Sequence, residues 1–323
     1  MLQKRVKTKK TLYNFSLIKY NITIESAQVL IERRNFTMKK LIALLMAAVL
    51  VFAFAGCAKN PANEETSTDA DVSNENVSEK EEETVDPNSD LGYVIGKGKL
   101  VVGITDFAPM DYQDENGNWI GFDAEMATAF AKKIGVEVEF VEINWDNKAL
   151  ELKNKSIDLV WNGMTLTEDV KAVMDYSNAY CNNAQVVIVK ASEADKYQTA
   201  EACKELNFAV EKGSAGKEMA EANGFKFTEV KDQATALSEV KAGTSDAAVI
   251  DSLMAAAMVG EGTGFADLTY TAKLNSEEYG VGCRKGSNLA AELNEFFKET
   301  YANGTMKTVA EKYGVQAAII EQK

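Results

Sequence analysis

The sequence predicts an α/β protein in which helices cover both faces of parallel sheets. Short apolar runs alternate with segments whose apolar residues recur every three or four positions. This alternation occurs twice, over residues 100–161 and again over 184–251. Ligands of such sheets bind beyond the carboxyl ends of the strands, so chemistry is expected on that edge.

Residues 158–170, DLVWNGMTLTEDV, show this edge most clearly. A buried strand over 158–161 is expected to lead through a turn of small residues into a helix. Thr167 is the expected N-cap because two acids follow it. Gly163 would let a ligand approach the backbone, and Thr165 would add a hydroxyl beside the free N–H groups of the helix start. Taken alone, the stretch could also be a plain strand-to-helix turn.

The first α/β pattern places three side chains at that edge. Its predicted elements are a strand at 100–104, a helix at 121–134, a strand at 136–143, a helix at 146–152 capped by Asp146, and the strand at 158–161. Phe107, Trp145 and Thr165 each follow a strand and should therefore lie together. Trp145 could instead belong to the core, and Trp161 is expected there because it ends a buried strand.

The second α/β pattern leads to Asp251, which ends a strand and precedes a helix. Asp251 could bind a ligand or cap that helix. The predicted elements are strands at 184–189, 207–210, 227–230, 247–250 and 279–283, and helices at 199–206, 215–223, 233–242, 288–303 and 306–313.

The composition excludes several classes of function. The 323 residues carry 35 Lys and Arg against 49 Asp and Glu, for a net charge of −14, and include no histidine. Without histidine, the Ser-His-Asp and Cys-His catalytic arrangements and the usual histidine zinc sites are ruled out. Phosphate contacts need Lys and Arg, so this acidic chain is a poor nucleic-acid binder. We expect no metal, no cofactor and no nucleic-acid partner.

The N-terminal residues have the layout of a secretory signal followed by a tether. Residues 38–57 hold a basic start, an unbroken apolar run, and Ala-Gly directly before Cys57. This ending resembles a bacterial lipobox, whose cysteine is lipidated and anchors the mature chain. Segment 58–90 is acidic and nearly free of large apolar residues, so a disordered tether is predicted. Residues 1–37 precede a complete signal. We interpret them as upstream sequence that is included because the start codon was assigned too early.

Several motifs of the folded part resemble those of family 3 extracellular solute-binding proteins, which serve ABC importers of polar amino acids. Residues 121–126, GFDAEM, resemble the signature of that family. The other matching motifs, in order and spacing, are 158–167, Gly213-Ser214, 246–251, Tyr279-Gly280 and 285–287.

This resemblance implies a two-lobed, type II periplasmic-binding-protein-like fold that closes on its ligand through two hinge strands. Lobe 1 is expected over 91–180 and 280–323, and lobe 2 over 181–279, with hinge segments near 181–185 and 275–279. Together with the lipobox, it implies a monomer that is held by a lipid anchor on the outer face of the plasma membrane. This monomer would pass an amino acid or a related small polar solute to permease subunits.

The ligand roles also follow from the resemblance. Phe107 and Trp145 would pack on the ligand, Thr165 would bind its α-carboxylate, and Asp251 its α-ammonium. Most members place an arginine where this chain has Val170. Two explanations are open: the ligand is a modified or larger amino acid, or its carboxylate rests on helix N–H groups and Lys171. The implied ligand-binding residues are Asp106, Phe107, Trp145, Asn162, Gly163, Thr165, Lys171, Ser214, Ala215, Gly216 and Asp251.

Two questions stay open from the sequence. The same fold occurs, by resemblance, in a cyclohexadienyl dehydratase, which would need an acid or base from Asp106, Glu211, Asp251 or Lys171. An extracellular sensor without transport is a further alternative. Cys181 and Cys283 lie near the two crossing strands and could form a disulfide if the register allows it.

Overall fold

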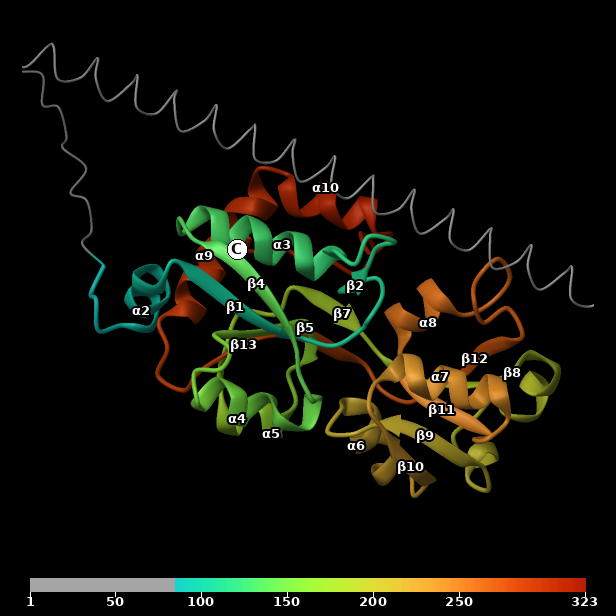
Figure 1. The fold of residues 1–323 in the computed structure, drawn as a ribbon. Coiled ribbons are helices and arrows are strands. Elements are labelled where there is room, and N and C mark those ends of the chain that lie inside the picture. The colour runs from blue at the N-terminus through green and yellow to red at the C-terminus, as the bar shows by residue number, and fades with distance from the viewer. Residues whose placement is uncertain (1–84) are drawn as a thin grey trace, which may run out of the picture. The chain divides into compact units, whose positions relative to one another are not determined.

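Two sheets with helices on their faces make up residues 85–323, the part of the chain that the computed structural model describes (Figure 1). The predicted α/β class is therefore confirmed. The expectations for 1–37, for the signal 38–57 with Cys57, and for most of the tether 58–90 lie outside these residues. No described helix is both long and apolar enough to span a membrane.

We call the first sheet with its helices lobe 1. Its strands are β1 (Lys99–Ile104), β4 (Glu137–Glu142), β5 (Leu159–Thr165), β6 (Asp175–Tyr176), β7 (Cys181–Asn183) and β13 (Glu277–Cys283). The strand order is β4-β1-β5-β13-β6, and β7 also pairs with β13. β1 is parallel to both β4 and β5, so the carboxyl ends of these three strands share one edge.

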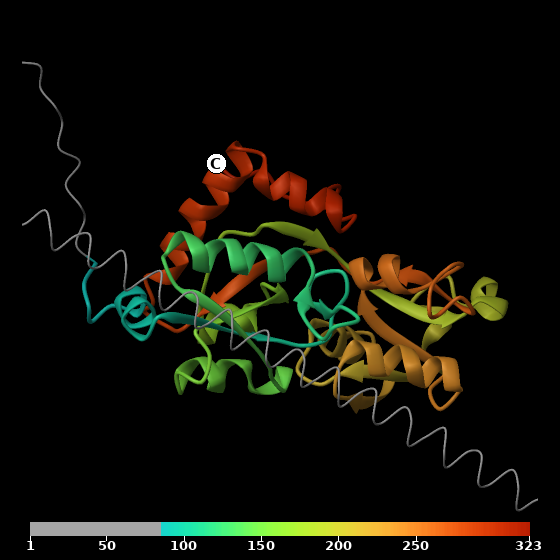
Figure 2. The same cartoon turned by 45° about the horizontal axis from the view of Figure 1, so that its top comes forward.

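Helices cover both faces of the lobe 1 sheet. They are α2 (Asp90–Lys97), α3 (Phe122–Lys133), α4 (Lys148–Lys153), α5 (Glu168–Val173), α9 (Leu289–Ala302), α10 (Thr305–Lys312) and the 3₁₀ turn η2 (Trp145–Asn147). A small hairpin, β2 (Tyr112–Gln113) with β3 (Trp119–Ile120), precedes α3. Figures 1 and 2 show α3 with the C-terminal helices α9 and α10 on one side of the sheet, and α4 and α5 on the other.

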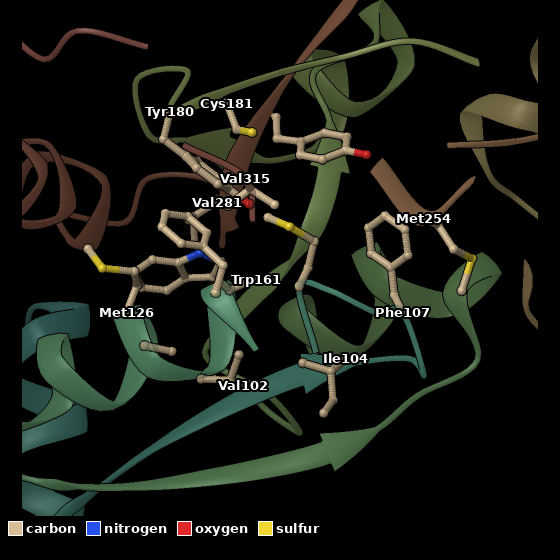
Figure 3. Close-up of a cluster of buried hydrophobic side chains, with 14 of the residues drawn as sticks. Val102, Ile104, Phe107, Met126, Trp161, Tyr180, Cys181, Met254, Val281 and Val315 are labelled. Atoms are coloured by element: carbon tan, nitrogen blue, oxygen red, sulfur yellow. The ribbon is translucent and has the colours of Figure 1, made fainter. Parts of the chain in front are cut away.

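Alternation along the strands explains these two layers. Leu100, Val102 and Trp161 pack in the cluster under α3 and α9, whereas Val101 and Val160 pack in the cluster under α4 and α5. Trp161 is fully buried, as predicted, and lies near Met126 in this cluster (Figure 3). It is edge to face with three phenylalanines of helices α3 and α9.

The second sheet with its helices is lobe 2. Its strands are β8 (Gln185–Lys190), β9 (Asn207–Glu211), β10 (Lys226–Val230), β11 (Ala247–Asp251) and β12 (Leu268–Lys273), in the order β10-β9-β11-β8-β12. Its helices are α6 (Ala215–Ala222), α7 (Gln233–Ala242), α8 (Ser252–Met258), η3 (Ala191–Lys196) and η4 (Glu201–Cys203). β9 is parallel to β10 and β11, so β9 and β11 end at the same edge.

The chain crosses between the lobes at two places. β7 belongs to the lobe 1 sheet and β8 to the lobe 2 sheet, with only Ala184 between them. The return passes from the end of β12 to the start of β13. β7 and β13 pair antiparallel, so the two crossings run side by side.

The structure corrects three local predictions. The strand expected over 158–161 continues to Thr165, because β5 keeps pairing with β13 beyond Trp161. Asn144 rather than Asp146 caps the turn before α4, since its side chain accepts the Asp146 N–H at 3.2 Å. The helix expected over 199–206 is only η4, because the N–H groups of Cys203 and Leu206 bond three residues back instead of four.

The Cys181–Cys283 disulfide that the sequence left open is excluded by the strand register. Cys181 lies opposite Tyr279, while Cys283 lies opposite Asp175, four positions further along β13. Four residues of a strand span about 13 Å, which is well beyond the reach of a disulfide. Both thiols are free and buried, as is Cys203.

Candidate functional site

A cavity of about 450 Å³ lies between the lobes. Its walls come from the carboxyl-terminal edges of both sheets and from the helix starts that follow them. The predicted ligand-binding residues that line it are Phe107, Trp145, Asn162, Gly163, Thr165, Ser214, Ala215 and Asp251. Gly216, Asp106 and Lys171 do not line it. The carboxyl-terminal edges of the two sheets therefore meet at one cavity, as expected for this fold class.

Gly163 forms the floor of the cavity together with Phe107. Its φ of 54° lies in the left-handed region, and a Cβ there would stand 2.3 Å from Phe107 Cε1. Glycine is thus required both by the backbone and by the packed ring. The Gly163 N–H donates to Asp123 Oδ2 at 2.7 Å, so this N–H is already used within the protein.

Asn162 holds the neighbouring loop rather than pointing freely at a ligand. Its Oδ1 accepts from the N–H of Thr105 at 3.0 Å and from the Thr105 hydroxyl at 2.8 Å. Its Nδ2 donates to Thr105 O and to Asp111 Oδ2. The ligand-binding role expected of Asn162 therefore competes with four internal hydrogen bonds of its side chain.

Two buried carboxyl groups lie behind this floor. Burial raises the pKa of Asp123 to about 7, against the lowering effect of hydrogen bonds from Tyr180 and Gly163. Burial, and then the charge of Asp123, raises the pKa of Asp111 well above its usual range. Each has one oxygen without a hydrogen-bond partner. Asp123 orients the N–H of Gly163, and Asp111 orients the amide of Asn162. These two carboxyl groups do not both ionise easily.

Trp145 and Lys148 form one rim of the cavity. Trp145 is 7% exposed and lines the hollow from η2, so it contributes to both the core and the wall. Lys148 Nζ stands 4.9 Å above the Trp145 ring and donates to Trp145 O at 3.2 Å. Burial lowers the pKa of this ammonium group. Lys148 was not predicted, because no sequence pattern shows which way a helix lysine turns.

Ser214 organises the opposite wall, where α6 begins. Its hydroxyl accepts the N–H of Lys217 at 3.2 Å, which is a standard N-cap, and donates to Glu211 O at 2.8 Å. Ala215 lies at the cavity surface, whereas Gly216 packs behind it near Gln185 Oε1 and Val249 O.

Asp251 is buried at the end of β11 and does not cap α8. The capping alternative therefore does not hold. Its Oδ1 accepts hydrogen bonds from Asn183, Gln185 and Tyr279, and its Oδ2 accepts one from Gln233. Burial, and then the charge of Glu277, raises its pKa to about 7.

Glu211 is a second buried carboxyl group in the same wall. Its Oε1 has no hydrogen-bond partner, and its Oε2 receives only a long 3.5 Å contact from Gln233. Burial, and then the charge of Asp251, raises the pKa of Glu211 to about 8. Gln233, which the sequence did not single out, joins the two acids because its Nε2 reaches both.

Two of the predicted polar residues bind other side chains, and a third is exposed to solvent. The Thr165 hydroxyl donates to Glu277 Oε1 at 3.0 Å. Lys171 is half-buried and pairs with Glu168 at 3.0 Å. Asp106 is exposed, and burial of part of the group followed by the charge of Asp232 raises its pKa. Val170 lines the cavity, so the arginine position implied by the family resemblance is apolar here.

The lobes touch at the rim of the cavity. Lys148 of lobe 1 donates to Gly213 O of lobe 2 at 2.9 Å. Lys212 pairs with Asp146 across the cleft at 3.0 Å, and Lys231 pairs with Glu142. A Cβ at Gly213 would stand 2.8 Å from Asp146 Cα. The structure thus has the two lobes in contact around the hollow.

No group of three or more potential metal ligands occurs within residues 85–323. What the arrangement offers is a small, partly apolar chamber whose polar groups come from both lobes. Such a chamber suits a small polar molecule held by hydrogen bonds and charge.

Comparisons with known proteins agree with this geometry. Residues 100–316 match the model of the bacterial extracellular solute-binding proteins, family 3. The chain is 28% identical to the arginine-binding extracellular protein ArtP of Bacillus subtilis, over 85% of this chain and 98% of that one. The chain is also similar to a crystal structure of a mutant form of ArgBP from T. maritima, with 32% identity and a TM-score of 0.66. This match covers 70% of this chain and 99% of that one.

A second similar structure bears on the enzyme alternative. It is the ancestral amino acid-binding protein AncCDT-1, described as a precursor of cyclohexadienyl dehydratase. It is 32% identical to this chain with a TM-score of 0.64, covering 70% of this chain and 99% of that one.

Proposed function

This chain belongs to the family 3 bacterial extracellular solute-binding proteins, and on that basis we propose that it captures one amino acid or a close derivative between its lobes. The observation that carries the proposal is the cavity of about 450 Å³ with Asp251 in one wall and Phe107 in the other. That volume suits a single small ligand. Delivery to the permease subunits of an ABC importer is part of the proposal.

The wall residues divide the binding of such a ligand between the lobes. Asp251 would accept a hydrogen bond from the α-ammonium at Oδ2, because this oxygen accepts only one hydrogen bond within the protein, from Gln233. The helix start at Ala215 would receive the α-carboxylate, since its N–H groups and the helix dipole favour an anion. Phe107 and Trp145 would cover the apolar part of the ligand. Closure would bring both halves of the site together.

The test is calorimetric titration of Asp251→Asn with an amino acid that raises the melting temperature of the wild type. Removing one charge from a desolvated pair costs roughly 2–5 kcal/mol. The affinity should therefore fall by about thirtyfold to several thousandfold, at about 1.4 kcal/mol per tenfold. The asparagine oxygen can still accept from Asn183, Gln185 and Tyr279, so the ligand-free protein should remain folded.

Asp246→Asn is the matched control. Asp246 is a lobe 2 carboxylate directly before β11 that accepts hydrogen bonds from Asn207 and does not line the cavity. Its variant should bind like the wild type, because the same Asp-to-Asn change is made outside the cavity. Wild-type affinity in Asp251→Asn would refute the assigned role, and the absence of any binding amino acid would refute the function.

We also propose that the protein is a monomer held on the outer face of the plasma membrane by lipid on Cys57. The sequence supports this through the signal at 38–57 and the acidic tether at 58–90. Cys57→Ser should release the protein into the soluble fraction with an unchanged melting temperature. Sedimentation of that variant with membranes would overturn the anchor.

The dehydratase alternative is less well supported than binding. The similar proteins named above are called binding proteins, and one is a precursor of the enzyme. Glu211 could act as an acid, but the acidic wall around it repels a substrate rich in carboxylates. Turnover of prephenate or arogenate would favour the enzyme. A sensor without transport would bind ligand equally well but would not support its uptake.

A further inference from the structure

The cavity wall is strongly acidic. Two kinds of charged residue line it: the lysines Lys148 and Lys217, and the acids Asp146, Asp169, Glu211, Glu218, Glu221 and Asp251. A wall with this excess of carboxylates creates a negative potential, which attracts cations and repels anions.

The two lysines of the wall are already engaged. Lys148 donates to the carbonyl oxygens of Trp145 and Gly213, at 3.2 and 2.9 Å. Lys217 pairs with Glu229 at 3.0 Å and with Glu221 at 3.5 Å. Arg284, the single arginine in 85–323, sits in a separate buried cluster with Asp90 and Asp158. Within the described residues, no arginine reaches the cavity.

The two buried acids of the wall differ in how well they are satisfied. Asp251 accepts hydrogen bonds from four side chains, two of which are Gln185 and Tyr279. Glu211 is 2% exposed and has no partner at Oε1. A buried carboxylate with a free oxygen is costly unless something compensates it. Of these two acids, Glu211 is therefore the one with an oxygen free to accept a hydrogen bond from a ligand.

We propose that Glu211 binds a positively charged group of the ligand beside Asp251, so that the ligand is an organic cation such as a basic amino acid or its amine. This deepens the proposed function and rests on it. Gln233 holds the two carboxyl groups at neighbouring positions, so one nitrogen group or two could bridge them. A neutral amino acid would leave Glu211 without a partner in the closed cavity.

The pH dependence of binding follows from the same geometry. The groups that act on Glu211 are Asp251 on β11 and Asp232 before α7, which raise its pKa, and Lys148 on α4, which lowers it; burial is the largest cause. Because the pKa is about 8 without ligand, much of the free protein is protonated at Glu211 near pH 7. A cation requires the ionised form, so its affinity should rise with pH from 6 to 8 and then level off.

The experiment is a set of calorimetric titrations with matched probes. The cations are L-arginine, L-lysine, agmatine and cadaverine, and the neutral amino acids are L-citrulline and L-glutamine. Agmatine and cadaverine lack the carboxylate, so they separate a bare amine from an amino acid. The wild type should bind a cation most tightly, and its affinity should rise with pH.

Glu211→Gln should lower the affinity for that cation at least tenfold, and its remaining rise with pH should level off near 7, where Asp251 titrates, instead of near 8. Glu205→Gln is the control, because Glu205 is an exposed lobe 2 acid outside the cavity that receives the same substitution. Tightest binding of a neutral probe, or an unchanged Glu211→Gln, would overturn the inference while leaving the proposed function standing. Binding of none of the probes or other amino acids would overturn both.

Discussion

At the scale of single residues, the site depends on a few side chains whose positions are strongly constrained. Gly163 shows this best, because its backbone is left-handed and Phe107 packs against its Cα. The ring of Phe107 in turn lies edge to face with Tyr279, which donates a hydrogen bond to Asp251. One glycine in lobe 1 is thus connected through two rings to the acid of lobe 2.

Gly163→Ala should destabilise the protein more than an alanine at an unobstructed glycine does. A left-handed φ costs a non-glycine residue about 1–2 kcal/mol. The overlap with Phe107 adds roughly 1–3 kcal/mol of overpacking. Urea unfolding measures both, and ligand affinity should fall as well, because Phe107 must move out of the cavity floor.

The control is Gly117→Ala, where φ is +80° and nothing lies within 4 Å of the added Cβ. It should show the backbone cost alone and bind ligand normally. Equal losses in the two variants would mean that the Phe107 contact does not constrain residue 163.

At the scale of elements, the sequence predicted best where a helix or strand has its own pattern. The helix expected over 233–242 is α7, because Asp232 caps it and Gly243 ends it in the left-handed conformation. The strand before Asp251 was equally clear from its unbroken apolar run. The segment 199–206 was mistaken for a helix, since composition does not show that its N–H groups bond three residues back.

The site was predictable from the chain only in part, for a related reason. Phe107, Trp145 and Asp251 could be named because each follows a strand. The free oxygen of Glu211 and the bridging role of Gln233 depend on which way side chains turn inside lobe 2. Lys148 depends on the opposite lobe, because its partner is Gly213 O, 65 residues away. No local pattern contains that information.

At the scale of the whole described unit, the function rests on two lobes that meet around one cavity. The lobes are joined by two neighbouring crossings, and at the rim they touch through Lys148, Lys212 and Lys231. The ion pairs there are exposed and contribute little each, about 0–1 kcal/mol. A balance this small is easily shifted by a ligand that contacts both walls.

Closure can be tested at Gly213, where the backbones of the two lobes come closest. An alanine Cβ there would stand 2.8 Å from Asp146 Cα in lobe 1, and neither backbone can turn aside as a side chain would. An open form avoids this overlap, whereas the closed form must accommodate it at roughly 1–3 kcal/mol. Gly213→Ala should therefore weaken ligand binding about five- to 150-fold.

The decisive measurement is the ligand affinity of Gly213→Ala beside that of Gly224→Ala, by calorimetric titration. Gly224 is in the same lobe, has a φ of +69° against +72° at Gly213, and has no atom within 4 Å of an added Cβ. Both variants should lose similar stability without ligand, and only Gly213→Ala should lose affinity. If Gly213→Ala binds ligand as tightly as Gly224→Ala, the ligand is not held by closure of the two lobes.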